Sequence, residues 1–172
     1  MIKKEIREDE EIVIESLRNK LKHIDFLVPT KQIQKGFDFV MYSASKDYFL
    51  KVQVKGSRVY ENGFLWFKVF DLAENVDYFV FTGSYYKYKA TLRNGRLDRK
   101  IDNMILIFSR EEIKRFFDNN LKKKTDEQDN QFYIRIENEN EVYWERGRGN
   151  SGKDLSDYLL KNKLKEIEEK IS

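Results

Sequence analysis

The sequence contains no cysteine and only one histidine, His23. The absence of cysteine excludes disulfides, thiolate zinc sites and cysteine nucleophiles, and a single histidine cannot build a histidine metal cluster. His23 fits the last turn of a helix, where the helix dipole favours it. Any metal site in this chain would therefore need oxygen ligands.

Long apolar runs are also missing. No run approaches the roughly 18 apolar residues of a membrane span. The start, MIKKEIREDEE, is charged throughout and has no apolar stretch behind it, which is unlike a signal peptide. The expectation is a cytoplasmic protein with no membrane contact.

Neither sign of charge dominates the 172 residues, since 33 Lys and Arg stand against 30 Asp and Glu, a net charge of +3. So small an excess does not by itself indicate a polyanionic partner, and contact with nucleic acid would have to be local. The 13 Phe and 10 Tyr supply bulky core material. The length suits one domain, which we expect to span residues 1–172.

The apolar pattern predicts an α/β fold with a central mixed β-sheet. Helices are expected at 3–24, 110–124 and 154–171, the last with Asp154 as its N-cap. Strands are expected at 26–28, 37–42, 48–55, 64–70, 76–83, 104–108, 131–136 and 141–146. We expect 37–42, 48–55 and 64–70 to form an antiparallel meander, 76–83 to be covered on both faces, and Asn94-Gly95 to form a hairpin turn.

The strand expected at 48–55 carries polar residues in a stretch that otherwise suits a core. Because side chains alternate along a strand, one face is apolar and the other holds Phe49, Lys51, Gln53 and Lys55.

Asp38 interrupts the preceding apolar strand in the same way. If Tyr42 pairs with Phe49 across the polar link between the two strands, the antiparallel register places Asp38 directly opposite Gln53. A slip of one residue would instead put the two side chains on different faces.

The first helix adds a third polar group. Glu10 falls within the apolar stripe of this helix, whereas Glu11 and Glu15 fall outside it. We therefore expect Glu10 to point toward the sheet.

Together, Asp38, Gln53 and Glu10 would offer three oxygen donors to a hard cation, Mg²⁺ or Mn²⁺. Lys55 would lie beside that cation. Such a site suits phosphodiester hydrolysis, because the cation activates a water and an ammonium stabilises the charge that grows on phosphorus.

A Glu in the first helix, then GFD, then a strand carrying QVK resembles the PD-(D/E)XK nuclease superfamily, which has the restriction-endonuclease-like fold. The resemblance covers about residues 1–110, in the order α-β-β-β, and leaves 111–172 as a C-terminal helix-hairpin-helix extension. It implies that Asp38, Gln53 and Glu10 bind the metal and that Lys55 assists catalysis.

Two residues depart from the family pattern. Phe37 stands where the family has a Pro that orients a turn and binds nothing. Gln53 stands where the family has a carboxylate, which removes a negative charge from the metal site and should weaken cation affinity.

Basic residues near the motif and in a later loop are candidates for nucleic-acid contact, although exposed charges that only solubilise the chain have the same pattern. They are Lys51, Arg58, Arg146, Arg148 and Lys153. The segment 84–96, SYYKYKATLRNGR, either stacks on nucleic acid or forms a half-buried strand. The segment 147–154, GRGNSGKD, matches the GxxxxGK of a phosphate-binding loop, except that Asp154 replaces the Ser or Thr.

The predicted function is a divalent-metal-dependent endonuclease, with DNA as the expected substrate and a homodimer if both strands are cut. One alternative is a degenerate relative that binds nucleic acid or a protein without cleavage, and another is a nucleotide hydrolase. A structural interpretation also exists for each residue: Asp38 starts a strand, Gln53 and Lys55 face solvent, and Glu10 offsets the helix dipole.

Overall fold

The computed structural model describes residues 8–29, 36–45, 47–57, 64–69, 73–86, 91–93, 96–98, 101–120, 130–145 and 152–171. The helices in this part of the chain are α1 (Glu8–Lys20), α2 (Arg110–Asn120) and α3 (Leu160–Ile171), and the short 3-10 helix η1 (Ser156–Tyr158) precedes α3. Among these residues, no helix is long and apolar enough to cross a membrane.

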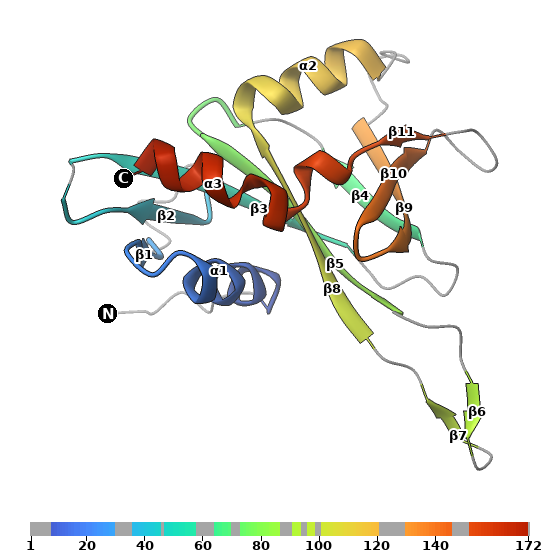
Figure 1. Cartoon of the computed structure of the whole chain (residues 1–172). Coiled ribbons are helices and arrows are strands. Elements are labelled where there is room, and N and C mark those ends of the chain that lie inside the picture. Colours follow the sequence, from blue (N-terminus) through green and yellow to red (C-terminus); the bar gives the residue numbers. More distant parts are fainter. Residues whose placement is uncertain are drawn as a thin grey trace.

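The central sheet is mixed, as predicted. Its order is β1-β2-β3-β5-β8, and only β3 and β5 pair in parallel. The strands are β1 (Asp25–Leu27), β2 (Phe39–Tyr42), β3 (Phe49–Gly56), β5 (Tyr78–Tyr86) and β8 (Ile101–Ser109). The chain therefore has a mixed α/β fold with helices packed on its sheet (Figure 1).

A second, antiparallel sheet has the order β11-β10-β9-β4. Its strands are β4 (Phe64–Val69), β9 (Asn130–Asn138), β10 (Glu141–Glu145) and β11 (Lys153–Asp154). The hairpin predicted at 131–136 and 141–146 is thus confirmed as β9 and β10. It joins β4, and so the C-terminal part of the chain completes a sheet that the N-terminal part begins.

The predicted meander is wrong in its third strand. β3 has β2 on one edge and β5 on the other, so neither edge is left for β4. β4 pairs with β9 instead. Next to the end of β3, the Ser57 hydroxyl bonds to β4: it donates to the Trp66 carbonyl at 2.7 Å and accepts from the Trp66 N–H at 2.9 Å.

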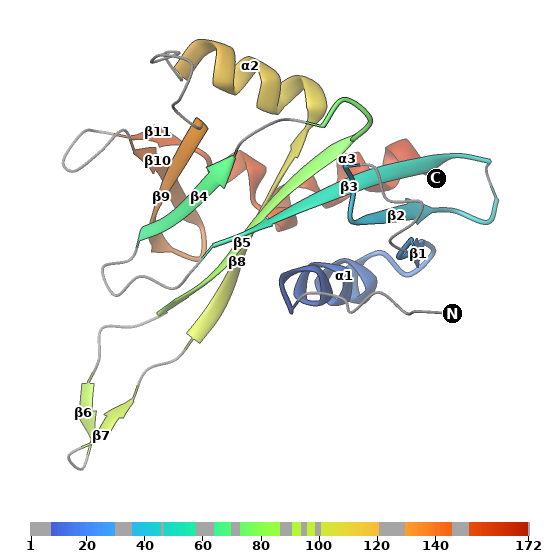
Figure 2. The ribbon, with the colours of Figure 1, turned by 180° about the vertical axis from the view of Figure 1, so that it is seen from behind.

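Two apolar clusters lie on opposite faces of the central sheet. On one face, α1 and α3 cover side chains of β2, β3, β5 and β8, including Val52, Val54 and Val80. On the other face, the second sheet and α2 cover Phe79, Phe81 and side chains of β8. Figures 1 and 2 show α1 and the second sheet on opposite sides of β5 and β8. The prediction that 76–83 is covered on both faces is confirmed.

The C-terminal helix is shorter than predicted. Lys153 and Asp154 pair with Trp144 and Tyr143 as β11, and α3 begins only at Leu160. Asp154 is therefore not the N-cap of this helix; its carboxylate accepts from the Ser156 N–H at 2.8 Å. Strand pairing with β10 overrides the local capping signal.

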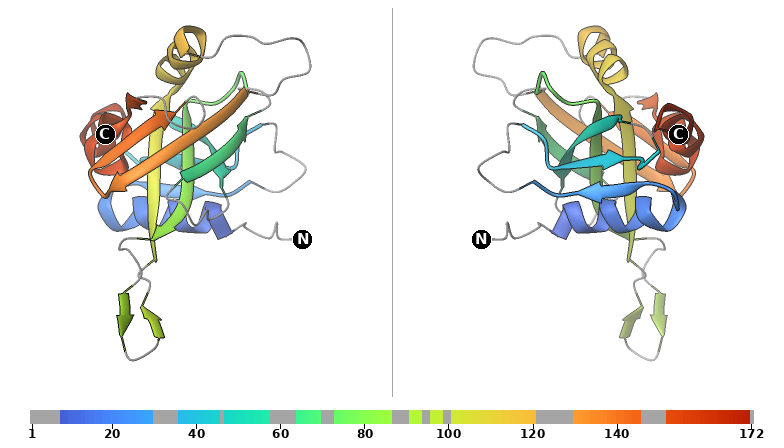
Figure 3. Two further views of the ribbon diagram at one scale, coloured as in Figure 1. Left: turned by 90° about the vertical axis from the view of Figure 1, so that its right-hand side faces the viewer. Right: turned by 90° about the vertical axis from the view of Figure 1, so that its left-hand side faces the viewer.

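The other differences concern ends and turns. α1 ends at Lys20 rather than residue 24, and residues 3–7 and 121–124 lie outside the described part of the chain. β6 (Thr91–Arg93) and β7 (Arg96–Asp98) form the predicted hairpin, with Arg93 opposite Arg96, although Asn94 and Gly95 are themselves not described. This hairpin projects from the two sheets (Figure 3).

Candidate metal centre

The register of β2 and β3 is the one that the sequence predicts. Tyr42 pairs with Phe49, and the ladder ends at Phe39 opposite Val52. One residue before Phe39, the Asp38 N–H donates to the Val52 carbonyl at 2.8 Å, and the Asp38 Oδ2 accepts from the Val54 N–H at 2.7 Å. The carboxylate of Asp38 therefore lies against the backbone of the residue between Gln53 and Lys55.

Gln53 and Lys55 share one face of the central sheet. In the parallel ladder, Gln53 pairs with Phe79 and Lys55 with Phe81, and paired residues lie on the same face. Both side chains are half-buried, and their face is the one that the second sheet covers farther along. The predicted alternation along this strand is confirmed.

The amide oxygen of Gln53 is buried and has no hydrogen-bond partner among the described residues. An unpaired buried acceptor costs about 1–3 kcal/mol, so such atoms usually mark a missing partner. Oxygen is the ligand type that Mg²⁺ and Mn²⁺ prefer. The Gln53 oxygen is therefore of a type that such a cation could take as a ligand. The Trp66 and Trp144 indole N–H groups, which cannot bind a cation, are likewise buried and without a partner among the described residues.

Glu10 is buried, with 1% of its surface exposed, whereas Glu11 and Glu15 are exposed. Its predicted burial is confirmed. However, α1 packs on the face of Val52 and Val54, which is opposite to the face of Gln53 and Lys55. An ion shared by Glu10 and Gln53 would therefore have to lie at the edge of β3 beyond the end of β2.

Asp9, which the sequence pattern does not indicate as a site residue, also approaches this edge. Its Oδ2 lies 1.9 Å from the position that a Cβ on Gly56 would occupy. A larger residue at position 56 would have to displace the Asp9 carboxylate, so the glycine lets the first turn of α1 lie close to the end of β3 directly after Lys55. The glycine after QVK was the available signal, but it did not indicate which segment comes close.

Among the described residues, no three Asp, Glu or His side chains form a group that could hold an ion. The candidate set instead combines the carboxylates of Asp38 and Glu10 with the amide of Gln53. We call these three residues and Lys55 the candidate metal centre.

The structure places two of the five basic residues that are predicted to contact nucleic acid, and the contact itself stays a prediction. Lys51 is half-buried on the face of Gln53, and its ammonium lies 5.5 Å from the centre of the Phe37 ring. Lys153 is exposed on β11, and its ammonium lies 5.5 Å from the Phe116 ring. Arg58, Arg146 and Arg148 lie outside the described residues.

The phosphate-binding-loop alternative is wrong in its geometry. In such a loop the lysine opens a helix whose N-terminus faces the phosphates. Here Lys153 lies in a strand, and the next α-helix begins at Leu160.

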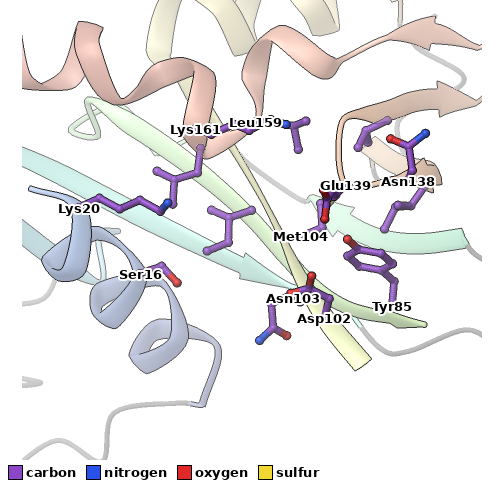
Figure 4. Close-up of a pocket in the computed structure, with 14 residues that line it drawn as sticks. Ser16, Lys20, Tyr85, Asp102, Asn103, Met104, Asn138, Glu139, Leu159 and Lys161 are labelled. Atoms are coloured by element: carbon purple, nitrogen blue, oxygen red, sulfur yellow. Dashed lines mark hydrogen bonds between the residues drawn. The ribbon is translucent and has the colours of Figure 1, made fainter. Parts of the chain in front are cut away.

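A pocket of about 320 Å³ lies away from the candidate metal centre, between α1, β8, the start of α3 and the β9–β10 turn (Figure 4). Met104, Ile105 and Leu160 form part of its apolar wall, and Lys20 and Lys161 are among its polar residues. No residue of the candidate metal centre lines it.

A buried ionic cluster joins α2, α3 and β5. The Lys163 side chain is only 6% exposed, and its ammonium lies 2.7 Å from the Glu112 Oε1 and also contacts Glu166. Burial lowers the pKa of Lys163, but its hydrogen bonds and charge interactions with the two carboxylates outweigh burial, and the pKa is raised overall. The Tyr78 hydroxyl donates to Glu166 at 3.3 Å, and burial together with that carboxylate raises the Tyr78 pKa.

No protein-family model and no curated protein matches this sequence.

Proposed function

We propose that this protein is a divalent-metal-dependent endonuclease that hydrolyses phosphodiester bonds in nucleic acid, with DNA as the expected substrate. The observation that carries the proposal is the contact of the Asp38 carboxylate with the Val54 N–H, between a buried, unpaired Gln53 oxygen and Lys55. The order α1, β1, β2, β3, with the three strands adjacent in one sheet, also agrees with the resemblance to the PD-(D/E)XK superfamily.

The residues have distinct roles in this proposal. Asp38, Gln53 and Glu10 would hold Mg²⁺ or Mn²⁺, which would supply Lewis-acid chemistry and a nucleophilic water at neutral pH. The backbone bond from Val54 fixes the direction of the Asp38 carboxylate. Lys55, on the face of Gln53, would stabilise the negative charge that develops on the phosphate in the transition state. Cleavage of both strands of a duplex would need two such sites and hence a homodimer.

Plasmid nicking tests the proposal. Wild-type protein should nick supercoiled DNA in Mg²⁺ or Mn²⁺, and Lys55→Met should slow nicking by about 100-fold or more, because one preorganised charge at the transition state is worth that much. Lys55→Arg, which keeps the charge, should retain part of the rate. Lys165→Met is the control, because it removes the same charge from a side chain of α3 that is 88% exposed. It should leave the nicking rate unchanged.

A protein that binds without cleavage is the second candidate, and the neutral Gln53 together with the placement of α1 on the other face favours it. Nicking that is absent in both metals, or that Lys55→Met leaves unchanged, would support this candidate and reject the nuclease. RNA of the same sequence, tested in parallel, would show which nucleic acid is the substrate.

Gln53→Glu separates the two candidates further. In a metal site the new carboxylate should raise Mg²⁺ affinity by about tenfold, since the number of charged ligands sets affinity. In EDTA, the melting temperature of Gln53→Glu should be below that of the wild type, because the new buried carboxylate has no partner. When Mg²⁺ is added, the melting temperature of the variant should rise more than that of the wild type. An equal response of both proteins to Mg²⁺ would contradict metal binding at this residue.

A further inference from the structure

The hairpin of β6 and β7 stands apart from the rest of the fold. Among the described strands, these two pair only with each other and belong to neither the central sheet nor the second sheet. Figures 1 and 3 show the hairpin beyond the ends of β5 and β8. An isolated two-stranded ribbon is only marginally stable in water, so this element adds little to the core.

The hairpin lies in a strongly basic part of the sequence. Residues 87–100 hold six of the 33 Lys and Arg but only one of the 30 Asp and Glu, which is Asp98. They carry an excess of five positive charges, whereas the remaining residues carry an excess of two negative charges. The net positive charge of the chain therefore comes from this segment, and it favours a polyanionic partner there.

The register of the hairpin brings like charges together. Arg93 lies opposite Arg96, and Thr91 lies opposite Asp98. Because positions alternate along a strand, these four residues share one face, on which Asp98 offsets one of the two arginine charges. Like charges directly opposite each other destabilise a sheet, and an anion bound beside the two arginines would remove that cost.

The hairpin extends from the end of the central sheet at which the QVK segment finishes. β3 and β5 run parallel, with Lys55 opposite Phe81. β5 continues for five more residues to Tyr86, about 17 Å at roughly 3.3 Å per residue, and β8 runs beside it. The acid on this stretch is Asp102, whose Oδ1 accepts from the Asn103 N–H at 2.8 Å. One turn of a duplex is about 34 Å long, so a nucleic acid at the candidate metal centre is long enough to reach the hairpin.

We infer that the β6–β7 hairpin binds the backbone of duplex nucleic acid and holds it against the candidate metal centre. This inference rests on the proposed function, which requires a nucleic-acid substrate, and adds a surface that contacts it. A two-stranded β-ribbon fits the major groove, about 12 Å wide, where basic residues can meet the phosphates of both strands. Phosphate contacts position a protein without reading the bases, so this contact is independent of sequence.

Fluorescence anisotropy in EDTA measures binding separately from cleavage. The probe is a labelled blunt duplex of about 30 base pairs, roughly three turns, titrated between about 50 and 200 mM salt. Arg93→Gln combined with Arg96→Gln should weaken binding about tenfold in the lowest salt. It should also lower the slope of log affinity against log salt by about 2, one for each lost phosphate contact. A second duplex of unrelated sequence should show the same loss.

Three variants separate the hairpin from other causes. Arg93→Lys combined with Arg96→Lys keeps both charges and should retain the salt slope. Lys114→Gln combined with Lys165→Gln removes two exposed charges from α2 and α3 and should bind as the wild type does. Asp98→Asn removes the acid of the hairpin and should tighten binding about threefold, a gain that a misfolded hairpin would not give.

The outcomes separate this inference from the nuclease proposal. Duplex binding that depends on Arg93 and Arg96, without any nicking, would keep the inference and reject the nuclease. If their glutamine variant binds as the wild type does, or loses no more affinity than the control on α2 and α3, the inference is overturned even when Lys55-dependent nicking is seen. Competition by polyglutamate as strong as that by unlabelled duplex would also overturn it, since the hairpin would then bind acidic chains of any kind.

Discussion

On the proposed nuclease function, replacing Asp38 with asparagine should slow cleavage strongly while leaving the chain folded. Asparagine keeps an oxygen that can accept from the Val54 N–H, now 2.7 Å from the Asp38 Oδ2, but it removes the negative charge that lies against the Gln53–Lys55 segment. Loss of an anionic ligand from a site that already contains a neutral amide should lower Mg²⁺ affinity steeply. We expect the nicking rate to fall about 100- to 1000-fold.

Asp77 provides a matched control for this substitution. Its Oδ2 accepts from the Lys51 N–H at 2.8 Å, so both carboxylates bind the backbone of β3 in the same way. Asp77→Asn should therefore reproduce any structural effect without the loss of nicking. If the two variants lose activity equally, or if Mn²⁺ titration shows unchanged affinity in Asp38→Asn, Asp38 is not a metal ligand.

The largest effect on stability is expected from Glu112→Gln. Glu112 holds two parts of the structure together: its Oε2 accepts from the Ser109 N–H at 2.8 Å at the start of α2, and its Oε1 contacts the buried Lys163 ammonium of α3. Removing the charge leaves a buried ammonium with only the half-exposed Glu166. Breaking one side of such a pair lowers the free energy of unfolding by about 3 kcal/mol.

Denaturant unfolding with two further variants checks the cause. Glu112→Gln combined with Lys163→Met should recover most of the loss, since no buried charge remains unpaired. The raised pKa of Lys163 means that the cluster contributes fully below the ordinary lysine pKa of 10.5 and progressively less as the pH rises above it. The advantage of the wild type over Glu112→Gln should therefore shrink above that pH, and an advantage independent of pH would argue against the ionic explanation.

The parts of the site that follow from local periodicity could be predicted from the sequence. Period two along β3 predicts that Gln53 and Lys55 share a face, and the apolar stripe of α1 predicts that Glu10 is buried. The short link between β2 and β3 allows few registers, and the choice that pairs Tyr42 with Phe49 is the observed one.

The parts that depend on distant segments could not be predicted. The partner of β4 is β9, more than sixty residues later, and an apolar strand pattern does not specify which edge it will join. Nothing in the pattern of α1 indicates that Glu10 reaches β3 from the face opposite to Gln53, or that Asp9 fills the space above Gly56. Asp is a common N-cap residue, but Asp154 pairs with Tyr143 as part of β11, and this pairing sets its extended conformation.

The placement of β4 has a consequence for how this chain can be divided. By sequence β4 connects two parallel neighbours of the central sheet, β3 and β5, and by pairing it belongs with β9 and β10. A fragment that stops after α2 would keep β2 and β3 but leave β4 without its partner β9 and Phe67 without part of its covering layer. The region after α2 is thus an integral part of the fold, because it supplies β9, β10 and β11 of the sheet that contains β4.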